Sequence, residues 1–406
     1  MAESSLPMET VLPARYVRAA ALWWLFALGV CAVVLAVTEY RPDDPDSRAY
    51  IDIAARLAGE PASKWVAPEW WGAWERKGLF QEHPPGIFYA PALLARAGYP
   101  AKQSLLLINA ICQALCLVLV AVLTARFAPA AVAPLTSSLL QLMPVAFVYR
   151  IRGNQEYPML AALLVAIYAT DRARERWPWA VVAVAAFVAG GLIKGVFALL
   201  FPAICALWLL ARRDRDAGAG GWAAVAGMMV AAPLLAVGYD AAYRAASGQS
   251  FLEYYLTARV SLEPASGTAA GALVRKAYNL AWYSSRLVWY AAPWSLAVLA
   301  LPWAARRTAP GSSWNARGVW FALAASILTV AALSARDTKA DRYIFPAYFV
   351  LGAAGIMAAC VIRPRWARAA ERLAALPYLP AALWLLLFLA RVLAGSSLPR
   401  FTFWRS

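Results

Sequence analysis

The sequence contains few charged residues for its length, and this scarcity excludes most soluble proteins. Only 15% of its 406 residues are Asp, Glu, Lys or Arg, whereas 63% are hydrophobic. An ordinary soluble domain is about a quarter charged and about half apolar, and a disordered chain is more polar still. Together with a mean hydropathy of +0.57, this composition indicates a polytopic membrane protein.

Histidine and cysteine are also scarce. The chain has one His and five Cys, and every Cys lies within an apolar stretch. This pattern matches neither a disulfide framework nor a Cys/His metal site. The net charge is +16, but the basic residues punctuate apolar stretches, as membrane topology requires, and form no soluble basic patch. We therefore exclude nucleic acid as a partner.

The apolar stretches predict a single all-α transmembrane domain over residues 1–406. About 20 apolar residues cross a bilayer as a helix, and the first stretch is long enough to be a signal anchor rather than a cleaved signal peptide. Gly190-Gly191 and Pro158 favour broken or tilted helices in the fifth and fourth spans. The eleven predicted spans are 17–38, 103–125, 131–149, 156–170, 178–193, 195–211, 222–242, 286–304, 318–335, 343–361 and 375–393.

Arginine clusters in alternate short connections indicate which side of the membrane is cytoplasmic. They place the N-terminus in the cytoplasm and the C-terminus outside. The outer, periplasmic side then receives two long loops, 39–102 and 243–285. We find no internal repeat, and we expect no soluble C-terminal domain.

The first outer loop contains two segments that we expect to lie along the membrane surface. Tyr50, Ile53, Ala54 and Leu57 recur at helical spacing, with charged residues elsewhere on the helix, so this part is a short amphipathic helix. Residues 86–95 form a second apolar segment that is too short to span a bilayer.

With this sidedness, the unusual polar residues gather at the outer end of the bundle. Acidic and cationic groups at the lipid boundary suit transfer of a sugar from a lipid-linked phosphate. The cations would bind the phosphate and stabilise it as it leaves, and a carboxylate would accept the proton of a hydroxyl acceptor. The candidate residues are Asp44, Asp46, Glu82, His83, Arg152, Asn154, Glu156, Lys194, Arg342 and Tyr343.

Simpler explanations exist for several of these residues. Asp46 could cap the amphipathic helix, Lys194 could reach the membrane interface by extending its side chain, and Arg342 could be an ordinary anchor beside a span. His83 could be a surface turn residue. Asp44 and Asp46 have the spacing of an Asp-x-Asp metal site. We predict no firm cofactor, but a divalent metal held by these two residues stays open.

The segments Asp46-Ser47-Arg48-Ala49-Tyr50 and Glu82-His83-Pro84-Pro85-Gly86 resemble the first outer loop of the GT-C membrane glycosyltransferases. Within that superfamily the resemblance is to bacterial protein O-mannosyltransferase-like enzymes and to aminoarabinose or galacturonic acid transferases of lipid A. Leu192-Ile193-Lys194-Gly195 and Arg342-Tyr343-Ile344-Phe345-Pro346 resemble later segments of the family. The likeness runs from about residue 17 to 361.

The resemblance implies an inverting transferase that uses an undecaprenyl-phosphate sugar at the periplasmic face of a bacterial inner membrane. It assigns Asp46 as the catalytic residue and His83 and Lys194 as contacts of the donor phosphate. We add Arg152 and Arg342 to the phosphate site. The family often has Asp-Glu where this chain has Asp46-Ser47, and the lipid A enzymes tend to have Lys where it has His83.

We therefore predict a glycosyltransferase whose partners are a polyprenyl-phosphate-linked sugar, the lipid bilayer, and a lipid, glycan or protein acceptor. The first alternative is a transporter or flippase of a lipid-linked or anionic solute, which would also bury cations near broken helices. It would not need an acidic amphipathic outer loop, and it usually shows internal repeats. A non-enzymatic membrane assembly protein is the second alternative.

Overall fold

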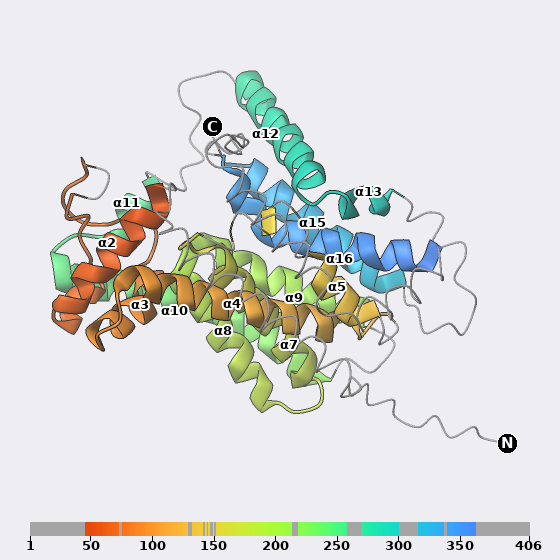
Figure 1. Cartoon of the computed structure of the whole chain (residues 1–406), viewed down its shortest axis with the longest axis horizontal. Helices are drawn as coiled ribbons and strands as arrows, with labels where there is room; N and C mark the ends of the chain where they lie inside the picture. The colour runs from red at the N-terminus through yellow and green to blue at the C-terminus, as the bar shows by residue number, and fades with distance from the viewer. Residues whose placement is uncertain are drawn as a thin grey trace, which may run out of the picture.

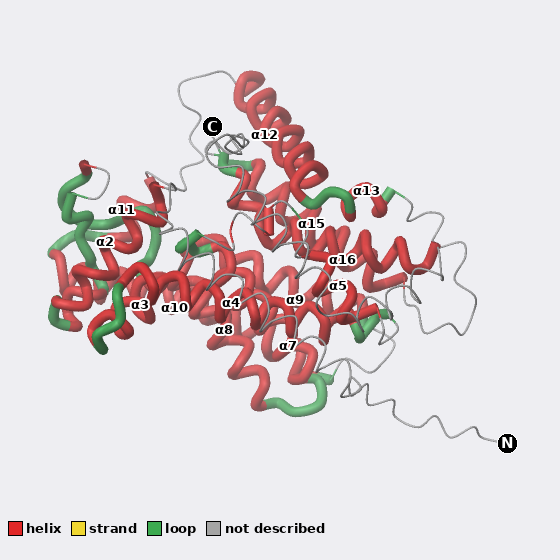
Figure 2. The backbone as a smooth tube through the Cα atoms, viewed as in Figure 1, coloured by secondary structure: helices red, strands yellow, loops and turns green. Residues whose placement is uncertain are grey.

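A computed structural model describes most of the central part of the chain (Figures 1 and 2). The predicted spans 17–38 and 375–393, the N-terminal orientation and Asp44 lie outside the described residues. All regular elements within the described part are helices, as expected. The described residues are 45–72, 75–128, 132–140, 143, 145–146, 149, 152–212, 218–257, 269–299, 316–336 and 339–362.

Five helical segments in this part are long and apolar enough to cross a membrane. They confirm a multi-pass membrane protein, and each overlaps at least one predicted span. Exposed Leu, Val and Trp side chains along their outer faces suit contact with lipid tails. The five are α4 (Ala101–Thr124), the α8–α9 segment (Pro178–Ala211), α10 (Ala219–Ser247), α15 (Ala316–Ser334, counted from Arg317) and η5 with α16 (Asp341–Cys360).

Helix α7 (Glu156–Ala173) forms the centre of the bundle. It packs against α4, α8, α9 and α10, and most of its side chains are buried. A helix that is apolar all round is expected in such a position, and its many Ala residues let neighbouring helices approach closely. Pro158 lies in its first turn, where proline causes no break. The remaining bundle elements are α5 (Val132–Leu140) and α16 (Phe345–Ile362), which pack together.

The break between the fifth and sixth predicted spans is at Gly195 and not at Gly190-Gly191. Helix α8 (Pro178–Lys194) continues through both glycines, and the short helix η3 (Gly195–Leu199) then leads into α9 (Leu200–Ala211). A Cβ on Gly190 would lie 2.8 Å from the Phe201 ring, so this glycine serves close packing. Gly195 has φ of +61°, a conformation that glycine adopts without steric cost.

The first outer loop folds into the two predicted helices. These are α2 (Pro45–Gly59) and α3 (Gly86–Arg96), with η1 (Ala62–Trp65) between them. Ile53 and Leu57 of α2 are completely buried against Phe88 of α3 and Phe80. Helix α3 also packs against α4 and α8. This packing attaches the loop to the bundle at one end of the molecule, on the left in Figure 1.

The predicted span 286–304 is wrong in its boundaries. Helix α12 (Ala269–Tyr290) already begins within the predicted outer loop 243–285 and ends at Tyr290, and α13 (Trp294–Val298) follows. Pro293 lies between them and lacks the backbone N–H that a continuous helix would need. The predicted loop also contains α11 (Phe251–Tyr255). Figure 1 shows α12 at the upper edge of the molecule, where it packs against α15.

The end of α7 opposite to Glu156 is held by a buried ionic cluster. Asp171 lies 3.1 Å from Arg126, 3.7 Å from Arg174 and 3.4 Å from Arg212. Trp208 also donates a hydrogen bond of 3.1 Å to this carboxylate. We predicted that arginines in these connections mark the cytoplasmic side. They additionally join the ends of α4, α7 and α9 through one carboxylate.

Close packing at Gly86 is testable. A Cβ there would lie 2.7 Å from the backbone oxygen of Leu192, which cannot move without shifting α8. We expect Gly86→Ala to destabilise the protein by about 1–3 kcal/mol, visible as a lower Tm in detergent. Gly238→Ala is the control, because a Cβ at that helical position meets nothing within 4 Å. Equal Tm values for the two variants would contradict the packing described here.

Candidate active site

Four segments that are distant in the chain bring ionisable side chains to one end of the bundle. They are the start of α2, residues 152–156, the end of α8 and the short helix η5 (Asp341–Ile344). The hydroxyl of Ser47 accepts a hydrogen bond of 3.0 Å from the Gly153 backbone N–H. Asn109 donates one of 2.7 Å to the Arg152 carbonyl. These bonds attach α2 and α4 to residues 152–156.

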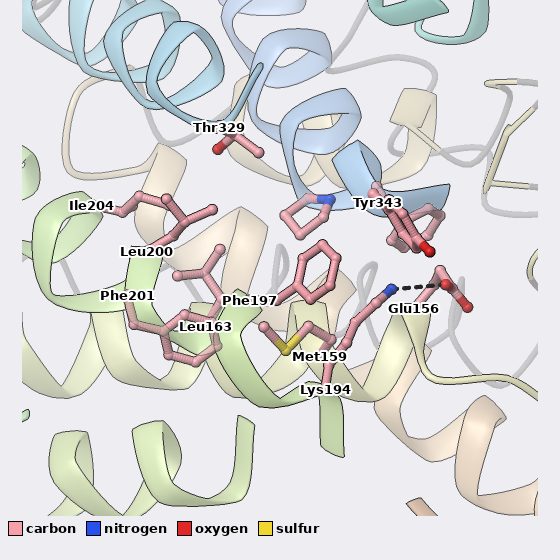
Figure 3. A pocket seen from close by; sticks show the side chains of 12 residues that line it. Glu156, Met159, Leu163, Lys194, Phe197, Leu200, Phe201, Ile204, Thr329 and Tyr343 are labelled. Carbon is pink, nitrogen blue, oxygen red and sulfur yellow. Dashed lines mark hydrogen bonds and ion pairs between the residues drawn. The ribbon is translucent and has the colours of Figure 1, made fainter. Parts of the chain in front are cut away.

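Lys194 and Glu156 form a buried ion pair at the centre of this region. The Lys194 Nζ lies 2.9 Å from the Glu156 Oε1, and the two residues are 4% and 1% exposed. Figure 3 shows this pair beside Tyr343, whose ring centre is 5.8 Å from the ammonium, and the Phe197 ring is 5.2 Å away. Because a lone charge in an apolar interior is costly, each member depends on the other.

Asp46 pairs with Arg342. The carboxylate lies in the first turn of α2, and its Oδ2 contacts the Arg342 Nη1. Both side chains stay partly accessible, at 14% and 30% exposed. The Arg342 guanidinium lies 6.0 Å from the centre of the Tyr343 ring, which also faces Lys194. The predicted catalytic carboxylate and Lys194 therefore lie in one cluster, linked through Arg342 and Tyr343.

Arg152 also belongs to this end of the bundle. It lies 5.4 Å from the Tyr149 ring centre and attracts the carboxylate of Asp341. Two α12 residues face the same carboxylate: Arg286 attracts it and Tyr290 hydrogen-bonds to it. Our sequence analysis missed both, because it placed them inside a span. Their spacing of four residues on an amphipathic helix could have indicated a shared face.

His83 lies in a different setting from Lys194. Its Nδ1 donates a hydrogen bond of 2.8 Å to the Pro84 carbonyl, which can only accept. In the neutral imidazole, Nε2 then accepts a hydrogen bond of 2.9 Å from the Tyr50 hydroxyl. That hydroxyl in turn accepts from Gln155 at 2.9 Å. The Tyr50 hydroxyl of α2 thus contacts both the buried histidine and Gln155, and a phosphate at His83 would have to replace one of the histidine's two bonds. Its role as a phosphate contact stays a prediction.

The remaining candidates lie around this cluster. Glu82 forms an ion pair of 2.5 Å with Arg76, and Asn154 is buried between Arg152 and Glu156 in the chain. The described residues bring no three His, Cys, Asp or Glu side chains together. The Arg342 cation already occupies the Asp46 carboxylate and would repel a metal ion. Asp44, the other residue of the predicted Asp-x-Asp pair, lies outside the described residues, so a divalent metal at this pair stays a prediction and we derive no step through one.

An apolar cavity begins at the Lys194–Glu156 pair. It is a narrow space between α7, α8, η3, α9, α15 and α16, with room for about one water molecule. Figure 3 shows the ion pair and Tyr343 at one side of it and hydrocarbon side chains at the other. Its lining residues are Glu156, Met159, Leu163, Lys194, Phe197, Leu200, Phe201, Ile204, Thr329, Tyr343, Phe345 and Pro346. The arrangement places a lysine ammonium beside a small apolar space.

The buried pair has a measurable consequence for stability. Lys194→Met or Glu156→Gln alone should cost about 3–5 kcal/mol, because each leaves one buried charge uncompensated. The double variant should recover most of that loss, which a Tm series in detergent would show. Glu175→Gln is the control, since it breaks the solvent-exposed pair with Arg172 and should cost about 1 kcal/mol or less. Additive losses in the double variant would contradict the coupling.

Residues 82–238 match the family model described as dolichyl-phosphate-mannose-protein mannosyltransferase. No curated protein gave a match. The structure is similar to that of ArnT from Cupriavidus metallidurans bound to undecaprenyl phosphate, with a TM-score of 0.63 and 17% identity. That match covers 87% of this chain and 61% of ArnT, so the chain spans about three-fifths of the length of this relative.

The Archaeoglobus fulgidus oligosaccharyltransferase is similar as well. Its apo structure aligns with a TM-score of 0.56 and 13% identity over 92% of this chain and 54% of that one. The archaeal oligosaccharyltransferase AglB from the same organism, in complex with an inhibitory peptide and a dolichol-phosphate, aligns with a TM-score of 0.53 and 12% identity. That match covers 91% of this chain and 55% of AglB. The chain therefore has the GT-C fold of membrane glycosyltransferases, as its sequence predicts.

Proposed function

We propose that the protein is an inverting glycosyltransferase, which moves a sugar from a polyprenyl phosphate to a hydroxyl acceptor. One observation carries this proposal: Arg342 and Tyr343 link Asp46 to Lys194 in a single cluster at the end of an apolar cavity. A carboxylate, several cations and a hydrocarbon-lined space are the parts that this reaction needs. The GT-C fold adds support, although fold by itself does not fix activity.

The donor is a sugar linked to a polyprenyl phosphate. Its phosphate would lie at Lys194, and its isoprenoid tail would enter the apolar space beside Leu163 and Ile204 as the side chains there move apart. ArnT, which has the same fold, is bound to undecaprenyl phosphate, and AglB to a dolichol-phosphate. Lys194, Arg342 and Arg152 are the donor-phosphate contacts in this proposal, with His83 as the fourth that the sequence predicts.

The phosphate enters a site whose cations already have carboxylate partners. Arg342 is paired with Asp46 and Lys194 with Glu156. A phosphate that takes over Arg342 releases Asp46, which is then free to act as a base. Since charge-assisted hydrogen bonds are strong in a site that excludes water, this change of partner would couple donor binding to activation of Asp46.

The transfer step forms one bond and breaks one. The acceptor hydroxyl gives its proton to a carboxylate oxygen of Asp46, and its oxygen bonds to C1 of the sugar from the face opposite the phosphate. The bond between C1 and the phosphate oxygen breaks, and both electrons stay with the phosphate. The leaving phosphate gains a negative charge, which Lys194 and the arginines stabilise. No separate general acid is required, because this leaving group is an anion at neutral pH.

The site belongs to the outer face of the membrane in this proposal. The positive-inside rule places the connections containing Arg172 and Arg212 in the cytoplasm, and Asp171 near them lies at the end of α7 opposite to Glu156. At 1.5 Å per residue, the 15 residues between these acids separate them by about 22 Å. The site is then periplasmic in a bacterial inner membrane, and the acceptor is a lipid, glycan or protein there.

Asp46→Asn should reduce transfer by at least about 10²-fold, because an amide cannot accept the proton, while donor binding persists. The measurement follows labelled sugar from polyprenyl phosphate into acceptors in membranes. Asp52→Asn, on the exposed face of the same helix, is the control and should transfer at the normal rate. Transfer by Asp46→Asn at that rate would remove Asp46 as the base. Labelled lipid that crosses the bilayer with no sugar transferred would support a flippase.

Lys194→Ala should weaken donor binding, because it removes the ammonium at the start of the cavity. We expect the donor concentration at half-saturation to rise at least tenfold, which equals about 1.4 kcal/mol. Lys276→Ala provides the control, since this lysine is exposed on α12. An unchanged saturation curve for Lys194→Ala would contradict its phosphate role.

A further inference from the structure

A second, polar hollow lies outside the Lys194 cavity. It is an open groove of about 720 Å³ between the first outer loop and the segment that joins α10 to α11. We call it the loop groove and define it by its lining residues. They are Trp70, Arg76, Lys77, Gly78, Leu79, Gln81, Gln249 and Tyr254. Unlike the first cavity, it is mainly lined by polar atoms, so it suits a hydrophilic ligand.

The first-loop wall of the groove is held in place by backbone hydrogen bonds. The Trp70 N–H donates a hydrogen bond of 2.9 Å to the Gly78 carbonyl, and the Phe80 N–H donates one of 2.7 Å to the Pro68 carbonyl. The Arg76 guanidinium lies 5.0 Å from the centre of the Trp70 ring. The wall is therefore a preformed structure and its cation has a fixed position.

The opposite wall is equally well defined. Gly248 ends α10 with φ of +75°, and Ser250 caps α11 by accepting from the Glu253 N–H. The Asp240 carboxylate accepts a hydrogen bond of 2.9 Å from the Ser250 hydroxyl and one of 2.8 Å from the Leu252 N–H. These bonds fix the segment that carries Gln249 and Tyr254.

Each wall is joined to one half of the candidate active site. From Trp70, aromatic contacts of 4.7 and 4.9 Å lead through Phe80 to His83. His83 bonds to Tyr50, which lies one helical turn after Asp46.

On the other wall, Tyr254 precedes Tyr255. The Tyr255 hydroxyl accepts 3.4 Å from the Val196 N–H, and Val196 lies two residues after Lys194. The two walls of the groove are therefore joined, through these intermediate contacts, to the helices that carry the predicted base and the donor-phosphate cation.

The side chains of the groove favour an acidic saccharide. Its lining has two cations, Arg76 and Lys77, and no carboxylate. Arg76 pairs with Glu82 beside the groove, whereas Lys77 is exposed and no carboxylate among the described residues pairs with it. Gln249 offers an amide for hydroxyl groups, and Tyr254 presents a ring that is 43% exposed.

We propose that the loop groove is the acceptor site and that it binds a saccharide bearing a phosphate or carboxylate group. The anionic group contacts Lys77 and Arg76, and the sugar packs against Tyr254. This inference rests on the proposed glycosyltransferase activity, for which it supplies the acceptor class. Electrostatic complementarity of this kind contributes mainly to specificity, so neutral saccharides are selected against.

Binding to full-length protein in detergent tests this inference without any chemistry. Glucose 1-phosphate and galacturonic acid are the probes, with glucose and galactose as their neutral counterparts, followed by saturation-transfer NMR or calorimetry. At least one acidic sugar should bind fivefold or more tighter than its neutral counterpart, and the pair that shows this identifies phosphate or carboxylate. Equal binding of acidic and neutral sugars in both pairs would overturn the proposal.

Variants locate the binding. Lys77→Glu and Tyr254→Ala should each lower the affinity for the acidic sugar at least fivefold. Lys64→Glu, a charge reversal at an exposed lysine of the same loop outside the groove, should leave it unchanged. Lys276→Glu, at an exposed lysine of α12 outside the groove, should also leave it unchanged. An affinity for the acidic sugar that Lys77→Glu leaves unchanged would overturn the assignment.

The outcomes separate the two proposals. If Asp46→Asn retains full transfer, the catalytic proposal fails whatever the groove binds. If Asp46→Asn abolishes transfer but Lys77→Glu leaves the affinity for acidic sugars unchanged, only the acceptor site is refuted. A Lys77→Glu protein that binds donor normally and transfers sugar with a raised acceptor KM supports both.

Discussion

The architecture depends on the requirement that a charge inside an apolar helix bundle has an opposite charge beside it. Lys194 meets this requirement through Glu156, at the first turn of the central helix α7. The pairing fixes the end of α8 against the start of α7, and the Gly195 turn then directs the chain into α9. The cavity, the aromatic rings around the ammonium and the attachment of η5 all take their positions from this contact.

The elements that a sequence predicts well are those governed by local periodicity. Helix α2 follows from apolar residues at helical spacing, and the long spans follow from their hydropathy. Gly190-Gly191 was misinterpreted as a break because glycine serves close packing as readily as it ends a helix, and only the position of Phe201 distinguishes these uses. The run 286–304 is almost entirely apolar after Arg286, so hydropathy could not show that the helix ends before Pro293.

The candidate site was predictable as a group but not in its pairings. Sidedness alone indicated that Asp46, Lys194 and Arg342 would share one end of the bundle. Which cation faces which carboxylate depends on helix rotation and on contacts between segments that are distant in the chain, and these have no local signal. The enclosure of His83 by Tyr50 and Gln155 could not be inferred for the same reason, and it changes how that residue is connected to the site.

The cluster around Asp171 has a consequence for how the bundle moves. One carboxylate joins three helices, at the ends opposite to Glu156, through arginines and the Trp208 indole, whereas the pair at the other end of α7 includes a lysine with a flexible side chain. Separating the helix ends at Asp171 would expose several buried cations at once. We therefore expect the helices to separate more readily at the Lys194 end of the bundle than at Asp171.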